Sequence, residues 1–317
     1  MVKFSDIEKA YEKIKGIANK TPVMTSGTLD DLLSASVYFK CENFQKTGSF
    51  KFRGAFNAVS GLTPQEKANG VITHSSGNHA QALALVSRLL NIPCVIVMPS
   101  NSSQIKIEAT RGYGAQIVTC GTAPEDRGQT AKKLVEEKGY TLIHPYNNDS
   151  TIAGAGSAMY EFIKDVKDLD FVFCPIGGGG LRSGTSIAAK KLLPDIKVIG
   201  VEPKNVDDAY RSFKSGRIIP NKSINTMADG LRTSLCERTF KIIQQNIDEI
   251  VTVSEEEILK AMRFCWENMK LVIEPSGAVS LAGVMCKQKE VKDKRIGAIL
   301  SGGNVELKTF FDSIQIP

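Results

Sequence analysis

The sequence has no apolar run long enough to form a helix that crosses a bilayer. Its first residues, MVKFSDIEKAYEKIKG, are charged and amphipathic, which is unlike the apolar centre of a secretory signal. Low-complexity tracts, internal repeats and long linkers are also missing. These absences predict a soluble globular protein without a membrane partner, which we expect in the cytoplasm.

Paired cysteines and clustered basic residues are missing as well. The seven cysteines are scattered, odd in number and never in a CxxC pair, so we interpret them as reduced, mostly buried thiols. The 40 Lys and Arg against 34 Asp and Glu give a net charge of +6, but the basic residues form no polybasic stripe. This pattern argues against a nucleic-acid partner. The mild positive excess fits an anionic small ligand, and an ordinary solvated surface explains it equally well.

The two familiar nucleotide fingerprints do not occur. Nothing fits GxxxxGK[ST], and GAGSAM lacks the third glycine of GxGxxG. ATP hydrolysis and NAD chemistry are therefore disfavoured.

What the chain does contain is a series of strand–turn–helix units. With 317 residues and 42% hydrophobic content, it has enough material for two domains. Short β-branched runs alternate with helix-period segments, which indicates an α/β protein with parallel sheets. We expect a smaller α/β domain at 69–147, inserted into a larger one made of 1–68 and 148–317.

The hexapeptide SFKFRG places Lys51 between two phenylalanines, directly after the turn-like QKTG. Burial against apolar neighbours disfavours the charged amine and lowers its pKa, as a nucleophilic or Schiff-base lysine requires. In the alternative interpretation, Lys51 extends from a helix start into solvent while the phenylalanines pack.

Four consecutive glycines, 177–180, lie between a buried strand and a helix. Successive glycines let backbone N–H groups converge on an anion, and the helix dipole adds to the attraction. This arrangement favours a phosphate site, whereas a close strand-to-helix approach is the structural alternative.

Two further polar turns have the same position between strand and helix: HSSGNHAQ at 74–81 and SGGN at 301–304. Ser and Asn in such turns are also ordinary helix-capping residues. Because turns at the carboxyl ends of parallel strands line one crevice, we expect the three turns and Lys51 to converge on one ligand.

Taken together and in this order, SFKFRG, SSGNHAQ, GGGGLRSG and SGGN resemble the fold type II pyridoxal-phosphate enzymes, in particular the serine racemase and serine/threonine dehydratase branch. The resemblance covers nearly the whole chain. It implies a tryptophan synthase β-like fold, pyridoxal 5'-phosphate as cofactor and a homodimer. It implies racemisation of L- and D-serine with elimination of serine to pyruvate and ammonia. The alternative is a serine/threonine dehydratase without significant racemisation.

The resemblance also implies the cofactor contacts. Lys51 would hold the cofactor covalently and act as the base at Cα, since pyridoxal phosphate stabilises the carbanion left there. A neutral hydroxyl at the pyridine nitrogen disfavours transamination. The implied cofactor-binding residues are Phe50, Lys51, Asn78, Gly177, Gly178, Gly179, Gly180, Leu181 and Ser301.

Position 76 distinguishes the two enzymatic alternatives. Dehydratases of this branch have S-A-G-N-H at this turn and racemases S-S-G-N-H, as here. Inversion needs a proton donor on the face opposite Lys51, and the resemblance assigns that role to Ser76, which a capping serine would not have. The implied substrate-binding residues are Ser75, Ser76, Gly77, Asn78, His79 and Arg127.

The resemblance further implies a structural Mg²⁺ or Ca²⁺ at Glu202, Asp208 and the Val206 carbonyl. Oxygen ligands suit these cations, although acidic loop residues are usually just solvated. An ATP effector site between subunits at Tyr113 and Lys270 is implied as well.

The chain departs from the family at two positions. Arg182 stands where an apolar residue is more common, and Tyr146 where some relatives have asparagine. A non-catalytic binding protein for a phosphorylated metabolite would keep the glycine turn but would not need Lys51.

Overall fold

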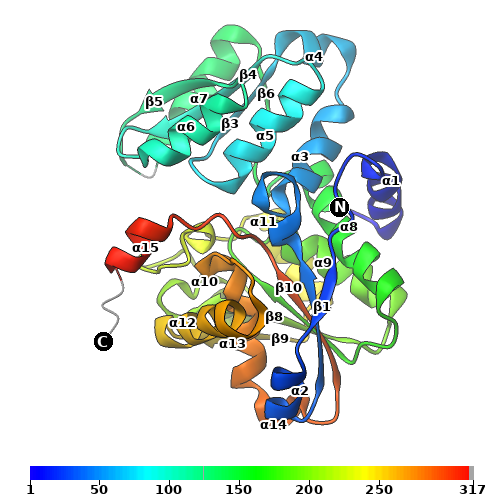
Figure 1. The fold of residues 1–317 in the computed structure, drawn as a ribbon. Helices are drawn as coiled ribbons and strands as arrows, with labels where there is room; N and C mark the ends of the chain where they lie inside the picture. Colours follow the sequence, from blue (N-terminus) through cyan, green and yellow to red (C-terminus); the bar gives the residue numbers. More distant parts are fainter. Residues whose placement is uncertain (124, 314–317) are drawn as a thin grey trace.

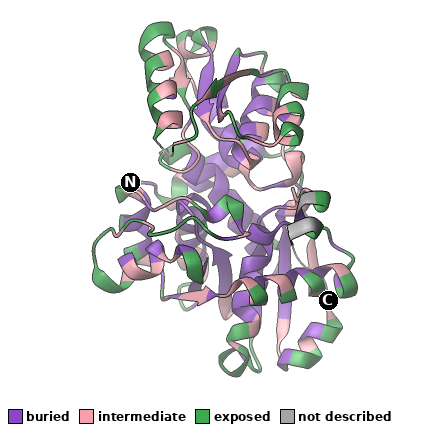
Figure 2. Ribbon diagram, turned by 90° about the vertical axis from the view of Figure 1, so that its left-hand side faces the viewer, coloured by how far each residue is buried: buried purple, intermediate pink, exposed green. Residues whose placement is uncertain are grey.

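The computed structural model describes residues 1–123 and 125–313. Two lobes, each built around its own sheet, lie one above the other in Figure 1, with α3 and α8 between them. In Figure 2 the central strands of both sheets are largely buried and the outer helix surfaces are exposed. Within the described residues, no helix has the length and apolar character needed to cross a membrane.

The larger sheet has six strands in the order β1-β2-β10-β7-β8-β9. All neighbours are parallel except β1 and β2, which pair antiparallel. The bounds are β1 (Val23–Thr25), β2 (Ser36–Cys41), β7 (Phe171–Pro175), β8 (Lys197–Pro203), β9 (Glu249–Val253) and β10 (Arg295–Leu300).

Helices cover both faces of this sheet, as the buried parallel strands require. One face packs against α2 (Gly27–Leu33), α12 (Glu255–Phe264) and α13 (Pro275–Cys286). The other packs against α1 (Phe4–Ile14), α8 (Asp149–Asp165), α9 (Gly180–Leu192), α10 (Asp208–Ser215) and α11 (Glu237–Asn246).

The smaller sheet has four parallel strands in the order β5-β4-β3-β6. The bounds are β3 (Val71–His74), β4 (Cys94–Pro99), β5 (Gln116–Cys120) and β6 (Thr141–Leu142). Its core on one side includes residues of α3 (Lys51–Ser60) and α5 (Asn78–Leu89), with α6 (Gln104–Gly112) beside them. The opposite side packs on α7 (Asp126–Lys138).

The remaining helical elements are short. They are η1 (Glu42–Phe44), η2 (Lys46–Gly48), α4 (Pro64–Asn69), η3 (Lys204–Val206), η4 (Asp229–Leu231), the π-helical η5 (Cys265–Met269), α14 (Gln288–Val291) and α15 (Leu307–Ser313).

The predicted α/β class with parallel sheets is confirmed. The antiparallel β1 was not anticipated, because three residues are too few for a period to be recognised. Strand β6 is only two residues long, because the chain then leaves the sheet: His144 Nδ1 accepts from the Asn147 N–H at 2.9 Å, and the His144 carbonyl accepts from the Thr151 hydroxyl at 3.3 Å. The domain limits at 69 and 147 stay a prediction.

Candidate active site

Lys51 is the first residue of α3, and its amine is turned inward rather than into solvent. The side chain is half-buried, Nζ donates to the Pro145 carbonyl at 3.1 Å, and the Phe50 ring centroid lies 5.0 Å away. Burial lowers the pKa of Lys51 to about 8, and the nearby Glu274 carboxyl opposes part of that shift. The geometry therefore favours a reactive lysine over one that extends into solvent.

A buried cluster of four charged side chains holds α3 in place behind Lys51. Arg53 donates from Nε to Glu42 Oε2 at 2.8 Å and from Nη2 to Glu161 Oε1 at 3.1 Å. Lys40 Nζ lies 2.6 Å from the same Glu161 oxygen. Two cations balance two carboxylates, so the burial of this cluster leaves no uncompensated charge.

Close helix packing adds to this constraint. A Cβ on Gly54 of α3 would lie 2.7 Å from the Thr151 carbonyl of α8, so only glycine permits this approach. The start of α3, and with it Lys51, is fixed relative to α8.

The glycine turn 177–180 follows β7 and leads into α9. Gly179 has a φ of 85°, in the left-handed region that glycine adopts most readily. Among the described residues, no carbonyl or side chain accepts from the N–H groups of Gly177, Gly178 or Gly179. The first N–H groups of α9 also lack intrahelical partners. These free donors fit a phosphate group, as the resemblance to the pyridoxal-phosphate enzymes implies.

Tyr146 covers this turn. A Cβ on Gly178 would overlap the Tyr146 ring, and one on Gly180 would lie 2.9 Å from Tyr146 Cβ. The ring also stands edge-on to His144 with centroids 4.7 Å apart, and His144 is edge-on to His74 at 5.3 Å. Burial raises the pKa of Tyr146 to about 12, so its hydroxyl stays protonated at neutral pH.

The turn between β3 and α5 carries Ser75, Ser76 and Gly77, all half-buried. Gly77 is the N-cap of α5, which has no side-chain cap, and Ser75 Oγ accepts from the Gly77 N–H at 3.3 Å. Ser76 is therefore not the capping residue. Its hydroxyl does not cap the amino end of α5 and is available to a ligand.

His79 is the second residue of α5, and its ring is buried. Nε2 lies 3.0 Å from the Ile143 carbonyl, and burial lowers the pKa of His79 to about 3. The imidazole is therefore neutral, its Nε2 is used by the Ile143 carbonyl, and its buried Nδ1 has no partner in the described part of the chain.

Asn78 links the two lobes through a hydrogen-bonded chain that sequence analysis missed. Asn78 Nδ2 donates to Glu274 Oε1 at 2.7 Å, and Asn304 Nδ2 donates to Asn78 Oδ1 at 2.8 Å. Burial raises the pKa of Glu274 to about 7. The sequence signal for Glu274 was available: a lone carboxylate precedes Pro-Ser-Gly in the otherwise apolar LVIEPSG.

Ser301, at the carboxyl end of β10, is buried, and its Oγ donates to the Ser276 carbonyl at 3.5 Å. The Phe50 N–H donates to the Ser301 carbonyl at 3.1 Å, and Ser49 pairs with Gly302. The third polar turn thus lies directly against the segment that precedes Lys51.

Arg127 lies in the first turn of α7 and is half-buried. Its charge acts on His74 and lowers the pKa of that imidazole, although burial has the larger effect. Arg127 therefore acts on the carboxyl end of β3, where the Ser75–Gly77 turn begins.

Glu202 and Asp208 lie together, and Leu235, whose N–H bonds Asp208, also lies against Gly179. Both are fully buried, and burial together with the neighbouring Asp208 raises the pKa of Glu202. Glu202 accepts from the N–H groups of Ala209 and Tyr210, and Asp208 Oδ2 accepts from Leu235 N–H at 2.9 Å while Oδ1 has no partner in the described part of the chain. Two buried carboxylates, one of them with an oxygen that lacks a hydrogen-bond partner, offer the oxygen ligands that suit a divalent cation.

The two residues of the expected effector site lie on different lobes. Tyr113 ends α6 and is covered by Arg88, whose guanidinium carbon lies 5.4 Å from the ring centroid. Lys270 follows η5 with a φ of 58°, and its Nζ donates to the Glu267 carbonyl.

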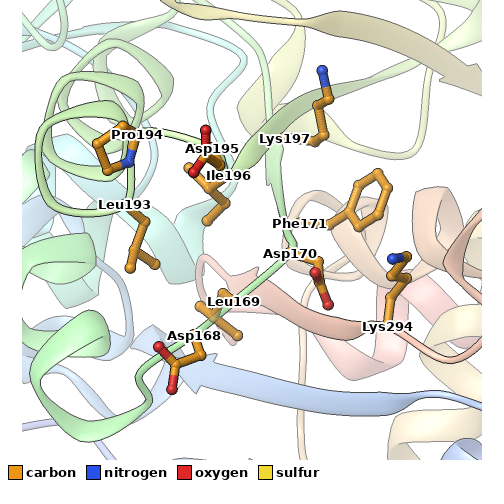
Figure 3. A pocket seen from close by; sticks show the side chains of 10 residues that line it. All are labelled: Asp168, Leu169, Asp170, Phe171, Leu193, Pro194, Asp195, Ile196, Lys197 and Lys294. Atoms are coloured by element: carbon orange, nitrogen blue, oxygen red, sulfur yellow. The ribbon is translucent and has the colours of Figure 1, made fainter.

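A hollow of about 520 Å³ lies elsewhere, at the amino ends of β7 and β8 (Figure 3). Since the glycine turn follows the carboxyl end of β7, this hollow is at the opposite edge of the sheet. Its lining is Asp168, Leu169, Asp170, Phe171, Leu193, Pro194, Asp195, Ile196, Lys197 and Lys294.

Comparisons with known proteins agree with this geometry. The family model described as "Pyridoxal-phosphate dependent enzyme" matches residues 14–302. An L-threo-3-hydroxyaspartate ammonia-lyase from Saccharomyces cerevisiae is 48% identical over 308 residues, 97% of this chain and 94% of that protein. A serine racemase from Dictyostelium discoideum is 46% identical over 313 residues, 97% of this chain and 96% of that protein. The crystal structure of the serine racemase from that organism superposes with a TM-score of 0.91 at 45% identity, covering 96% of this chain and 99% of that one.

Proposed function

The chain belongs to the family of pyridoxal-phosphate-dependent enzymes, and we propose that it interconverts L- and D-serine and also eliminates water from serine to give pyruvate and ammonia. The observation that carries the proposal is the convergence on Lys51 of the Ser301 turn and the Asn78–Glu274 pair. Relatives whose names include serine racemase and an ammonia-lyase support both reactions.

Pyridoxal phosphate, when bound, supplies an electron sink for the negative charge left at the substrate Cα. We assign its phosphate to the N–H groups of residues 177–181 and its ring hydroxyl to Asn78. Ser301 would contact the pyridine nitrogen and Phe50 the ring. The neutral hydroxyl of Ser301 offers no charge to hold that nitrogen protonated, which disfavours transamination.

Two residues would move protons. Lys51, whose lowered pKa of about 8 leaves part of its amine neutral near pH 7 to 8, would take the Cα proton from one face. Ser76, which does not cap α5, would donate a proton to the other face. The substrate carboxylate would be held by the N–H groups and hydroxyls of residues 75–79, with Arg127 near the opening.

The test is a chiral assay of purified protein with L-serine, in which D-serine and pyruvate are measured together. We expect both products. Pyruvate without D-serine supports the second candidate, a serine/threonine dehydratase; the relative named L-threo-3-hydroxyaspartate ammonia-lyase favours an elimination of this general kind. Absence of a visible absorption band with added pyridoxal phosphate would instead support a non-catalytic binding protein.

A structural Mg²⁺ or Ca²⁺ is also proposed at Glu202, Asp208 and the Val206 carbonyl. The buried pair of carboxylates supports it, since a divalent cation compensates both charges. Within residues 1–123 and 125–313, no group of three or more His, Cys, Asp or Glu side chains is placed to hold a metal. The remaining ligands would therefore be backbone carbonyl and water.

We propose a homodimer in the cytoplasm, with an ATP effector site between subunits at Tyr113 and Lys270. The Phe44 and Val272 side chains are both exposed, and the Asn43 side chain bonds the Val272 carbonyl, so two exposed apolar side chains belong to neighbouring segments. All seven cysteines are free, which fits a reducing compartment. The molar mass from light scattering of protein eluted from a size-exclusion column tests the dimer. The rate of serine turnover measured at increasing ATP concentrations tests the effector site.

A further inference from the structure

Arg182 is a fully buried cation without a counter-ion. It belongs to the first turn of α9, two residues after the last glycine of the turn, and is one of the largest fully buried side chains. None of its three guanidinium nitrogens has a hydrogen-bond partner of normal geometry in the described part of the chain. A buried charge in this condition strongly destabilises a fold.

The surrounding groups do not neutralise it. Arg182 interacts chiefly with the Cys174 thiol, and burial raises the pKa of that thiol, so the sulfur carries no charge at neutral pH. Asp248 has a smaller effect on Arg182 and forms no ion pair with it; its carboxylate bonds the Val198 N–H at 2.7 Å and Lys190 at 2.8 Å. Burial lowers the pKa of Arg182 only to about 10, so the guanidinium stays positive.

The position of Arg182 at the amino end of α9 adds to the uncompensated positive charge in this part of the interior. The amino end of a helix already carries a partial positive charge, which disfavours a cation in the first turn. Cys174, which the guanidinium contacts, is three residues before Gly177, a separation of at most about 10 Å along an extended chain. An anion held by the turn would face both positive sources in an interior where charges are weakly screened.

We propose that Arg182 supplies a buried positive charge that strengthens binding of a phosphate group at the turn 177–180, without touching that phosphate. The inference rests on the proposed cofactor site. It assigns to Arg182 a positioning and affinity role that the apolar residue common at this position in relatives does not have. The charge destabilises the protein when the turn is empty and is compensated when a phosphate is bound.

The experiment compares the parent with Arg182→Met, which keeps an unbranched stem but removes the charged guanidinium, and with Arg182→Lys, which keeps the charge. Each holoenzyme is dialysed against a series of pyridoxal phosphate concentrations, and the bound fraction is measured from the visible absorption band. The same series is run with pyridoxal, which has the aldehyde but no phosphate. Melting temperature is measured with and without inorganic phosphate.

For Arg182→Met we expect the dissociation constant of pyridoxal phosphate to rise by about tenfold or more, and that of pyridoxal to change less than about twofold. Arg182→Lys should stay within about threefold of the parent. Inorganic phosphate should raise the melting temperature of the parent more than that of Arg182→Met. Without phosphate, Arg182→Met should melt at or above the parent's temperature, because an unpaired buried charge has been removed.

Equal affinities for pyridoxal phosphate in the parent and Arg182→Met overturn the inference and leave the proposed function intact. Equal losses for pyridoxal phosphate and pyridoxal also overturn it, since packing rather than charge would then be responsible. One outcome is that Arg182→Met yields no folded protein while Arg182→Lys behaves as the parent. In that case the melting temperature of the parent with and without inorganic phosphate decides, and an unchanged melting temperature contradicts the inference. A parent that does not bind pyridoxal phosphate contradicts the proposed function itself.

Discussion

Asn78 donates from Nδ2 to Glu274 Oε1 at 2.7 Å, joining the first residue of α5 in the small lobe to a residue 196 positions later in the large lobe. Glu274 is buried, and its backbone N–H donates to the Gly302 carbonyl at 3.2 Å. The orientation of Asn78 therefore depends on a carboxyl group that itself lies against the Ser301 turn. Two of the polar turns are coupled through this one contact.

Replacing Lys51 by alanine should abolish the visible absorption band and lower both reactions by about a thousandfold or more, because the cofactor tether and the base are lost together. Absorption spectra and serine assays measure the two effects. Lys46→Ala is the matched control, since Lys46 also lies near an aromatic ring, 5.9 Å from the centroid of Phe52, and should keep band and rate. Turnover within tenfold of the parent in Lys51→Ala would contradict the assignment.

Ser76→Ala should separate the two reactions. Removal of the hydroxyl leaves proton abstraction by Lys51 intact, so pyruvate formation from L-serine should stay within about threefold, whereas D-serine formation and use of D-serine should fall by about a hundredfold or more. The measured quantity is the ratio of D-serine to pyruvate. An unchanged ratio would show that Ser76 has no part in racemisation.

Chelation should lower the melting temperature and the rate, and added Mg²⁺ or Ca²⁺ should restore both, because a ligand bound only by the folded state stabilises it. Glu202→Gln should remove this response. The control is Asp207→Asn, an adjacent carboxylate that pairs with Arg211 at 2.7 Å and should keep the response. A melting temperature that is the same with and without chelator argues against the cation site.

The pH dependence of stability should contain a contribution from Glu274. Burial raises the pKa of Glu274 to about 7 in the folded chain against 4.5 for an ordinary carboxyl, so the folded state binds the extra proton between these values. Its contribution to stability is complete below about 4.5 and is lost as the pH rises through 7.

In Glu274→Gln this loss cannot occur. The free energy of unfolding of the variant minus that of the parent should therefore increase by up to about 3 kcal/mol between pH 4.5 and 8. Denaturant titrations of protein freed of cofactor measure the difference. Glu136→Gln, at an exposed position on α7, should show no such trend. A difference that is flat across this range would mean that Glu274 titrates normally.

Much of the fold was determined by local sequence. Alternation of β-branched runs with helix-period segments predicted the α/β class with parallel sheets, and glycines 177–180 marked the turn after β7, because these features depend on neighbouring residues. The motif order identified the family. Three residues of β1 and two of β6 carried too little pattern to be placed correctly.

Only the tertiary structure decided which distant residues meet. Asn78 with Glu274, Arg53 with Glu42 and Glu161, and Tyr146 on the glycine turn come from separate elements, so no spacing in the sequence reveals them. Sequence alone marked Arg182 as unusual for its position. That it is buried without a counter-ion follows from the packing of α9 on β7, because desolvation depends on what surrounds a charge and not on its neighbours along the chain.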